Sequence, residues 1–347
     1  MKAVVVRDTG GPEVLVLENV PDISPGPGEL VVKVAACGVC FHDIVTRNGT
    51  LKAGVVPPFI PGHEISGTVV GMGRDVTQFK LGDRVATTQR THICGHCRHC
   101  RSAREPLCAD ATFMGDAGLN GGYAEYVATG ADTVARIPEG VDTESAAIAA
   151  CAIGTMLHAV RAIGRVQIGE RVLVTGASGG LGIHGVQLAK HAGAFVIGHT
   201  GSPDKAAAIR AAGADVVVVT ARGADFSAEI RDATGGEGVD VVLDTVGTPV
   251  FGPVRRSIAR GGRWVLIGQL LGGFVPFNPA QLFLRGISLL SATSTTREEL
   301  VDVLTLIQRG IVSPHIAGTL PLAQAADAHA RMESGSLVGR LLLRPAT

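Results

Sequence analysis

Residues 171–185 read RVLVTGASGGLGIHG, an apolar strand that leads into a glycine-rich turn and then into a helix. Ala177, Gly179 and Gly182 fill the three small positions of a G/A-x-G-x-x-G loop. Small residues there let the backbone approach a pyrophosphate and let the helix pack closely on the strand, while the helix N-terminus supplies N–H donors. A glycine-rich turn without a ligand is the alternative. We predict dinucleotide binding by Ala177, Ser178, Gly179, Gly180, Leu181 and Gly182.

Five more apolar runs follow this strand at intervals of about twenty residues. They are AFVIGHT (194–200), DVVVVT (215–220), DVVLDTVG (240–247), RWVLIG (263–268) and ISLLSAT (287–293). Segments with helical character separate them, and strands that alternate with helices build a parallel sheet covered on both faces. We therefore predict an α/β protein in which residues 153–292 form a doubly wound Rossmann domain with a six-stranded parallel sheet. Val246 and Gly268, late in two of the runs, are added to the predicted cofactor-binding residues.

The end of the second run indicates which dinucleotide binds. An Asp or Glu about 20 residues after the glycine loop would hold the ribose of NAD, but this chain has Thr200 there, with Ser202 and Lys205 beside it. Hydroxyls and a lysine can hold a 2′-phosphate, which a carboxylate would repel. The alternative is that Asp204 and Lys205 only begin a helix. We predict NADPH as the cofactor, with NADH less favoured.

Residues 1–152 have a different pattern, in which short β-type runs alternate with Gly/Pro turns. ELVVKVAACGV (29–39) and ISGTVVGMG (65–73) are examples. Because helical periodicity is scarce here, we predict a β-rich domain with long loops. The tail contains a helix, TREELVDVLTLIQRG, and a short β ending, GRLLL. We expect residues 293–347 to pack on the first domain.

Composition excludes several classes of protein. The chain has 347 residues, 46% of them hydrophobic, and its 31 Lys and Arg balance its 31 Asp and Glu. A chain without net positive charge lacks the electrostatic signature of a nucleic-acid or membrane-surface protein. The uncharged stretch 145–160 is shorter than the ~20 residues of a membrane span. The first residues, MKAVVVRDTGGPE, do not resemble a signal peptide. We expect a soluble, cytoplasmic protein.

Cysteines form the most specific motif. Four of the seven fall within fifteen residues, a spacing that suits metal ligation in a reducing compartment better than disulfides. Four thiolates can close a tetrahedral zinc site with no open position, so this site is predicted to be structural. Its ligands would be Cys94, Cys97, Cys100 and Cys108.

A second group, Cys40, His63-Glu64 and Cys151, is dispersed and by spacing alone makes a weak case for a site. Several motifs, however, occur in the order seen in zinc-containing medium-chain alcohol dehydrogenases, which the whole chain resembles. They are GVCFHD (38–43), PGHEISGTVVGMG (61–73), the four-cysteine loop, ACAIGTMLHA (150–159) and TGASGGLG (175–182). The resemblance implies a chaperonin-10-like β-rich catalytic domain, a nucleotide domain, and an active site between them.

The resemblance also implies the roles of individual residues. Cys40, His63 and Cys151 match the catalytic zinc ligands, so that two zinc ions per chain are expected. Glu64 matches a carboxylate that can enter the metal shell, and Asp43 matches the carboxylate that orients the ligand histidine. Arg340 resembles a basic residue that reaches the cofactor pyrophosphate.

One position departs from the pattern of alcohol dehydrogenases. They carry Ser or Thr two residues after the first zinc cysteine, where its hydroxyl passes on the substrate proton, but this chain has His42. We predict that His42 takes over the proton transfer; a role in lining the cofactor cleft, and transfer through water, are the alternatives. Within the family, TGASGGLGIHGVQLAK, DTVGTPVF and IAGTLPL are similar to the archaeal acryloyl-CoA reductase branch.

These observations predict an NADPH-linked alcohol dehydrogenase or carbonyl reductase, in which zinc polarises the oxygen of an alcohol, aldehyde, ketone or conjugated carbonyl. An NADPH-dependent enoyl-thioester reductase is the nearest alternative. A non-catalytic NADPH-binding protein is the alternative from another class, and the retained zinc ligands argue against it. We expect a homodimer or homotetramer and no nucleic-acid or membrane partner.

Overall fold

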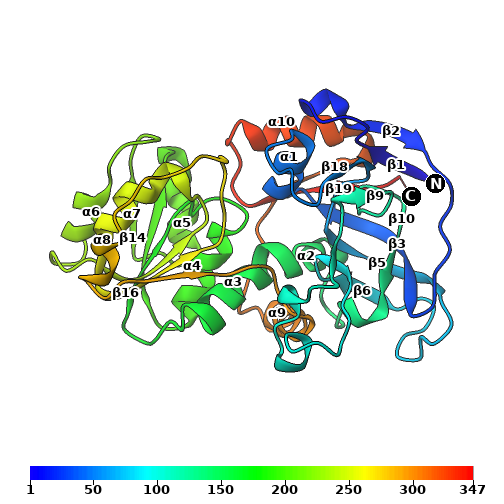
Figure 1. Cartoon of the computed structure of the whole chain (residues 1–347), viewed down its shortest axis with the longest axis horizontal. Helices are drawn as coiled ribbons and strands as arrows, with labels where there is room; N and C mark the ends of the chain where they lie inside the picture. The colour runs from blue at the N-terminus through cyan, green and yellow to red at the C-terminus, as the bar shows by residue number, and fades with distance from the viewer. Residues whose placement is uncertain (347) are drawn as a thin grey trace. The chain divides into compact units, whose positions relative to one another are not determined.

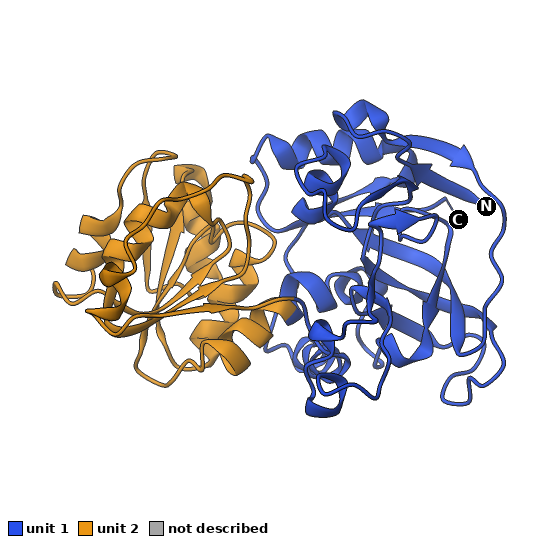
Figure 2. Ribbon diagram, viewed as in Figure 1, with its two compact units in different colours: residues 1–154, 294–347 blue, residues 155–293 orange. Residues whose placement is uncertain are grey.

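The computed structural model describes residues 1–346 of the chain. They form two compact units, coloured separately in Figure 2. Unit 1 comprises Met1–Gly154 with Ser294–Thr347, and unit 2 comprises Thr155–Thr293. In the part of the chain that the structure describes, no helix combines the length and the apolar character needed to cross a membrane.

Unit 2 contains six parallel strands in the order β14-β13-β12-β15-β16-β17. The order reverses between β12 and β15, which is the switch point where ligands bind in doubly wound sheets. This confirms the predicted Rossmann sheet (Figure 1). The strands are β12 (Arg171–Val174), β13 (Phe195–Thr200), β14 (Val216–Val219), β15 (Val239–Asp244), β16 (Ile258–Leu266) and β17 (Ser288–Ser291).

Strand β16 starts five residues before the predicted run at Arg263. Ile258 pairs with Val239 of β15, and the next paired residue, Arg263, lies opposite Val241. The residues between Ile258 and Arg263 thus bulge out of the ladder. They include Gly261 and Gly262, which interrupt the apolar pattern, so the early part of the strand could not be recognised in the sequence.

A buried carboxylate fixes the carboxyl edge of this sheet. Asp244, at the end of β15, accepts a hydrogen bond from Thr175 Oγ1 (2.8 Å) and another from Trp264 Nε1 (3.1 Å). It also accepts from the backbone N–H groups of Val246 and Gly247. Asp244 therefore ties together the loops that follow β12 and β15, where a dinucleotide is predicted to bind.

Helices and a hydrophobic core complete unit 2. Fully buried side chains in the core include Leu173, Ile197, Phe226, Val242 and Trp264. The helices that cover the sheet are α4 (Gly182–His191), α5 (Ala206–Ala211), α6 (Ser227–Asp232), α7 (Phe251–Ser257) and α8 (Ala280–Phe283).

Unit 1 is built on a seven-stranded sheet in which β3 (Glu29–Gly38) is central. It pairs antiparallel with β5, β10 and the C-terminal strand β19. Gly38 consequently lies opposite Glu64 on one side and Leu342 on the other. The pairing brings the end of β3, the His63-Glu64 motif and the C-terminal strand to one place. The other strands of this sheet are β5 (Glu64–Met72), β6 (Arg84–Thr87), β10 (Tyr126–Gly130), β11 (Val134–Arg136), β18 (Ile316–Pro321) and β19 (Arg340–Arg344).

Smaller elements surround this sheet. Three two-stranded sheets consist of β1 (Lys2–Val5) with β2 (Val16–Asn19), β4 (Val56–Phe59) with β9 (Ala117–Gly118), and β7 (Arg90–His92) with β8 (Thr112–Phe113). The helices are α1 (Phe41–Arg47), α2 (Thr143–Ala147), a π-helical turn over Ala149–Gly154, α9 (Arg297–Gln308) and α10 (Ala325–Glu333). Helix α9 packs against the π-helical turn, which carries Cys151.

Candidate active site

Cys40 lies at the N-cap of helix α1, where the chain leaves β3. Its backbone N–H donates to Asp43 Oδ2 at 2.8 Å. The same carboxylate accepts the N–H of Gly62 through Oδ1 at 3.2 Å. Asp43, which is 2% exposed, therefore fixes both chain segments that carry the dispersed motif.

His63 and Glu64 follow a glycine that the site requires. Gly62 has φ +98°, and a Cβ there would lie 2.5 Å from the ring of Tyr123. A larger residue would be strained in its backbone and would clash. His63 and Glu64 are both buried at the start of β5, so the glycine turn delivers them to the interior.

Cys151 reaches the same place from the π-helical turn. Such turns widen the helix and occur frequently at functional sites. Cys40 Sγ and Cys151 Sγ are 3.9 Å apart, and one ligand atom from each of Cys40, His63, Glu64 and Cys151 lies within 4.8 Å of the others. Two thiolates on a tetrahedral zinc at about 2.3 Å would be about 3.8 Å apart, whereas a disulfide needs about 2 Å. The donor set fits zinc.

An arginine holds Glu64. Arg340 Nη2 lies 3.0 Å from Glu64 Oε1, and both side chains are almost completely buried. Burial raises the pKa of Glu64 to about 7, although the charge of Arg340 opposes this shift. The contact of Arg340 with the cofactor pyrophosphate stays a prediction; in unit 1 its charge is directed to Glu64.

A series of polar contacts links Asp43 to side chains of the protein interior. His63 Nδ1 lies 3.2 Å from Asp43 Oδ1, without the alignment of a hydrogen bond. Tyr123 Oη donates to Asp43 Oδ2 at 3.3 Å and lies 3.0 Å from His329 Nε2. His329 Nδ1 in turn lies 3.5 Å from Arg47 Nη1. Arg47 also pairs with Glu333 at 2.6 Å.

The direction of this series follows from its chemistry. Arginine can only donate, so Nδ1 of His329 accepts. Burial lowers the pKa of His329 to about 4, so the ring is neutral and carries its proton on Nε2, which donates to Tyr123. Burial, and then the charge of Asp43, raise the pKa of the Tyr123 hydroxyl, which remains a donor to Asp43. Tyr123 and His329 were not predicted, because no local motif marks them.

His42 points to a second carboxylate. Its Nε2 lies 2.7 Å from Asp116 Oδ1, and Thr46 Oγ1 donates to the same oxygen at 3.4 Å. The His42 ring centroid is 4.5 Å from that of Phe113 and 5.2 Å from that of His63. The structure therefore places His42 beside His63, a predicted zinc ligand, with its Nε2 directed at Asp116. Asp116 was not predicted, because it lies 74 residues away in the chain.

The four-cysteine loop brings its thiols together as the spacing predicts. Cys94 Sγ is 3.9 Å from Cys100 Sγ, and Cys97 Sγ is 3.6 Å from Cys100 Sγ. The ligand atoms of Cys94, Cys97, Cys100 and Cys108 all lie within 4.8 Å of one another. The backbone N–H of Cys100 helps to lower the pKa of Cys97 to about 6, which favours the thiolate. This donor set also fits zinc.

The predicted dinucleotide loop lies at the carboxyl edge of the sheet in unit 2. Helix α4 begins at Gly182, where a Cβ would come within 2.1 Å of the Gly176 carbonyl oxygen. Only glycine at this position therefore allows the start of the helix to pack so closely on the preceding turn. Dinucleotide-binding loops require this close packing. Val246 and Gly268 follow the neighbouring strands β15 and β16 at the same edge.

Positive charge gathers after strand β13. Thr200 ends the strand, and the backbone N–H of Ser202 donates to its hydroxyl at 3.3 Å. Burial lowers the pKa of Lys205, and Arg222 contributes to this shift. Arg222, which the sequence analysis did not single out, thus adds a second cation beside Lys205, while Asp204 is the carboxylate next to it.

Comparisons with known proteins agree with this geometry. Residues 26–139 match the alcohol dehydrogenase GroES-like domain, and residues 180–309 match the zinc-binding dehydrogenase family. An acryloyl-coenzyme A reductase of Sulfurisphaera tokodaii is 33% identical over 99% of this chain and 100% of its own length. An alcohol dehydrogenase of Geobacillus stearothermophilus is 35% identical over 99% of each chain. A crystal structure of AibC superposes with a TM-score of 0.92 at 43% identity, covering 100% of this chain and 96% of the other.

Proposed function

Because the chain belongs to the zinc-containing medium-chain dehydrogenase/reductase family and is an oxidoreductase of that family, we propose that it transfers hydride between NADP(H) and a small alcohol or carbonyl substrate. The carrying observation is the cluster of Cys40, His63 and Cys151, with its two sulfurs 3.9 Å apart. Two thiolates and one imidazole leave a fourth position of a tetrahedral ion open to substrate, as in catalytic zinc sites.

The bound groups would supply the electrophile and the hydride: zinc as a Lewis acid on the substrate oxygen, and NADPH as the hydride carrier. The protein's own residues orient this chemistry. The Asp43 carboxylate lies 3.2 Å from Nδ1 of His63, and Arg340 holds Glu64 beside the cluster. The contact of His42 Nε2 with Asp116 Oδ1 leaves Nδ1 as the ring atom that would accept the substrate proton.

Cofactor preference is the second part of the proposal. Thr200 offers a hydroxyl where NAD enzymes carry an acidic residue. Arg222 lies against Gly201, the next residue, and its charge acts on Lys205. Two cations next to hydroxyls favour the 2′-phosphate of NADPH. We assign the adenosine end of NADPH to this group and its pyrophosphate to residues 177–182.

A second candidate, an NADPH-dependent enoyl-thioester reductase, is favoured by one observation. His42 replaces the hydroxyl that alcohol dehydrogenases use to pass on the substrate proton, and a relative of similar identity is an acryloyl-coenzyme A reductase. Reduction of a conjugated carbon has no need of that particular hydroxyl. Hydride acceptance by enoyl thioesters, measured against aldehydes and ketones, separates the two candidates.

We also propose that the chain forms a homodimer or homotetramer and is located in the cytoplasm. Around the edge strand β17, the side chains of Phe283, Leu284 and Leu289 are exposed. An apolar surface beside an unpaired strand edge is typical of an interface between chains. This supports the homodimer or homotetramer, which light scattering of the purified protein would test.

The test of the catalytic proposal is a pair of measurements on the zinc-loaded protein. Zinc content should be two ions per chain, and Cys40→Ala should reduce it to one. The variant should stay folded, because the four-cysteine site is intact, and should lose NADPH oxidation with carbonyl substrates. A wild-type protein with one zinc per chain would instead support the non-catalytic alternative.

A further inference from the structure

A pocket in unit 2 lies at the amino ends of the sheet strands, opposite the carboxyl ends where the cofactor residues are predicted. Its volume is about 840 Å³, within the range of about 300–1,000 Å³ typical of small-molecule sites. It opens where β12, β15 and β16 begin, whereas the dinucleotide loop follows the end of β12. Five arginines line it, and we call it the arginine pocket: Arg171, Arg231, Arg256, Arg260 and Arg285.

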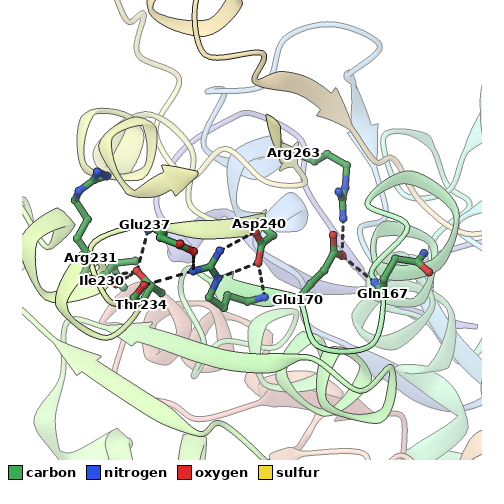
Figure 3. Close-up of polar contacts among 10 residues, drawn as sticks. Gln167, Glu170, Ile230, Arg231, Thr234, Glu237, Asp240 and Arg263 are labelled. Carbon is green, nitrogen blue, oxygen red and sulfur yellow. Dashed lines mark hydrogen bonds and ion pairs between the residues drawn. The ribbon is translucent and has the colours of Figure 1, made fainter. Parts of the chain in front are cut away.

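Two of these arginines are paired with carboxylates. Arg171 binds Asp240 at 3.0 Å and Glu237 at 2.6 Å, so the two carboxylates of the pocket share one guanidinium. Figure 3 labels Glu237 and Asp240, together with Arg231 of the same pocket. Arg256 Nη2 lies 2.8 Å from Asp225. The two carboxylates that line the pocket, and Asp225 beside it, are therefore already engaged.

The other three arginines have no carboxylate partner among residues 1–346. Arg285 donates to the carbonyl oxygens of Ile258 and Arg255, and Arg231 donates to that of Arg256 at 3.4 Å. The Arg260 side chain makes no hydrogen bond or ion pair with any described residue. Each keeps guanidinium N–H donors in excess of its acceptors.

These guanidinium groups repel one another. Burial, together with the charges of Arg231, Arg260 and Arg255, lowers the pKa of Arg285. The C-terminal ends of α6 and α7 attract Arg231 and Arg256, which lie in the last turns of those helices. Arg260 lies in strand β16, so no helix end accounts for its position.

We propose that the arginine pocket binds a multiply charged phosphate group, a pyrophosphate or oligophosphate, at a site separate from the cofactor loop. Guanidinium groups bind phosphate oxygens with two parallel hydrogen bonds. An anion with several charges would satisfy the free donors of Arg231, Arg260 and Arg285 together and relieve their repulsion. A single carboxylate would leave most of the positive charge unbalanced.

The test is calorimetric titration of the intact protein with inorganic pyrophosphate. NADPH is kept saturating, because the cofactor loop also binds a pyrophosphate. We expect saturable binding that weakens as salt is added. In the double variant Arg231→Gln, Arg260→Gln, binding should weaken by at least about tenfold, equal to about 1.4 kcal/mol. Arg210→Gln, which changes an exposed arginine of α5, should bind like the wild type.

A titration with ATP identifies the ligand, and a second variant keeps the test valid if the double variant does not fold. ATP that binds more tightly than pyrophosphate indicates a nucleotide ligand, and equal affinities indicate that the phosphate chain alone is recognised; both support the site. If the double variant unfolds, Arg260→Gln alone, which removes no hydrogen bond, replaces it. The absence of saturable binding in the presence of NADPH, or unchanged affinity in the arginine variants, would overturn the proposal.

Discussion

Replacement of Tyr123 by phenylalanine tests the contacts behind the proposed catalytic zinc. Tyr123 is fully buried, and its hydroxyl joins Asp43 to His329. The substitution keeps the ring and removes only this oxygen. Asp43 Oδ2 then retains the N–H of Cys40, and Nε2 of His329 loses its partner.

The expected size of the effect follows from these two losses. A hydrogen bond to a charged group contributes about 1.5–3 kcal/mol, and a buried polar group left without a partner costs about 1–3 kcal/mol. Since the Tyr123–Asp43 bond is long, at 3.3 Å, we take the low end of both ranges and expect stability to fall by about 2.5 kcal/mol. Loss of a contact behind a metal ligand typically lowers metal affinity about 10–100-fold, and we expect about tenfold here.

The assay is competition for zinc with a chelator, together with denaturant unfolding. Tyr126→Phe is the matched control, since Tyr126 is the other tyrosine of the chain and its hydroxyl makes no hydrogen bond within residues 1–346. Chelator should remove the first zinc from Tyr123→Phe at a lower concentration than from Tyr126→Phe. If both variants hold zinc as the wild type does, Tyr123 does not support Asp43 and the reasoning fails.

Three further substitutions test the other assigned roles. Cys97→Ala should lower thermal stability, because a closed zinc site contributes folding free energy; an unchanged melting temperature would argue against a structural zinc there. The wild type should prefer NADPH over NADH by at least about tenfold in kcat/KM, or about 1.4 kcal/mol, and Thr200→Asp should reduce that preference; a wild type that prefers NADH refutes the assignment. His42→Ala should lower kcat by about 10² or more, shift the pH profile of alcohol oxidation, keep its zinc, and recover part of the rate with added imidazole. A higher KM for NADPH with an unaltered pH profile would instead place His42 in the cofactor cleft.

Local motifs account for what the sequence could predict. The glycine loop after β12 and the four-cysteine loop each combine their functional residues within a short segment, so spacing alone identifies them. Cys40, His63 and Cys151 lie far apart in the sequence, and only the resemblance to a family connected them before the structure did.

The supporting contacts could not be predicted for a physical reason. Tyr123 and His329 are 206 residues apart, and they meet because the C-terminal segment that carries α10 and β19 belongs to unit 1. Asp116 resembles any loop carboxylate until β8 and β9 position it against His42. Contacts of this kind depend on tertiary packing. They produce no hydrophobic periodicity and no motif of fixed spacing that could be recognised in the sequence.

The rate of NADPH oxidation by the zinc-loaded protein tests the central claim most directly. It should be measured with a panel of aldehydes, ketones and enoyl thioesters, for the wild type and for Cys40→Ala. The account predicts turnover with at least one aldehyde or ketone, faster than with any enoyl thioester, and its loss in Cys40→Ala. Turnover restricted to enoyl thioesters, or carbonyl reduction that survives the loss of Cys40, would contradict it.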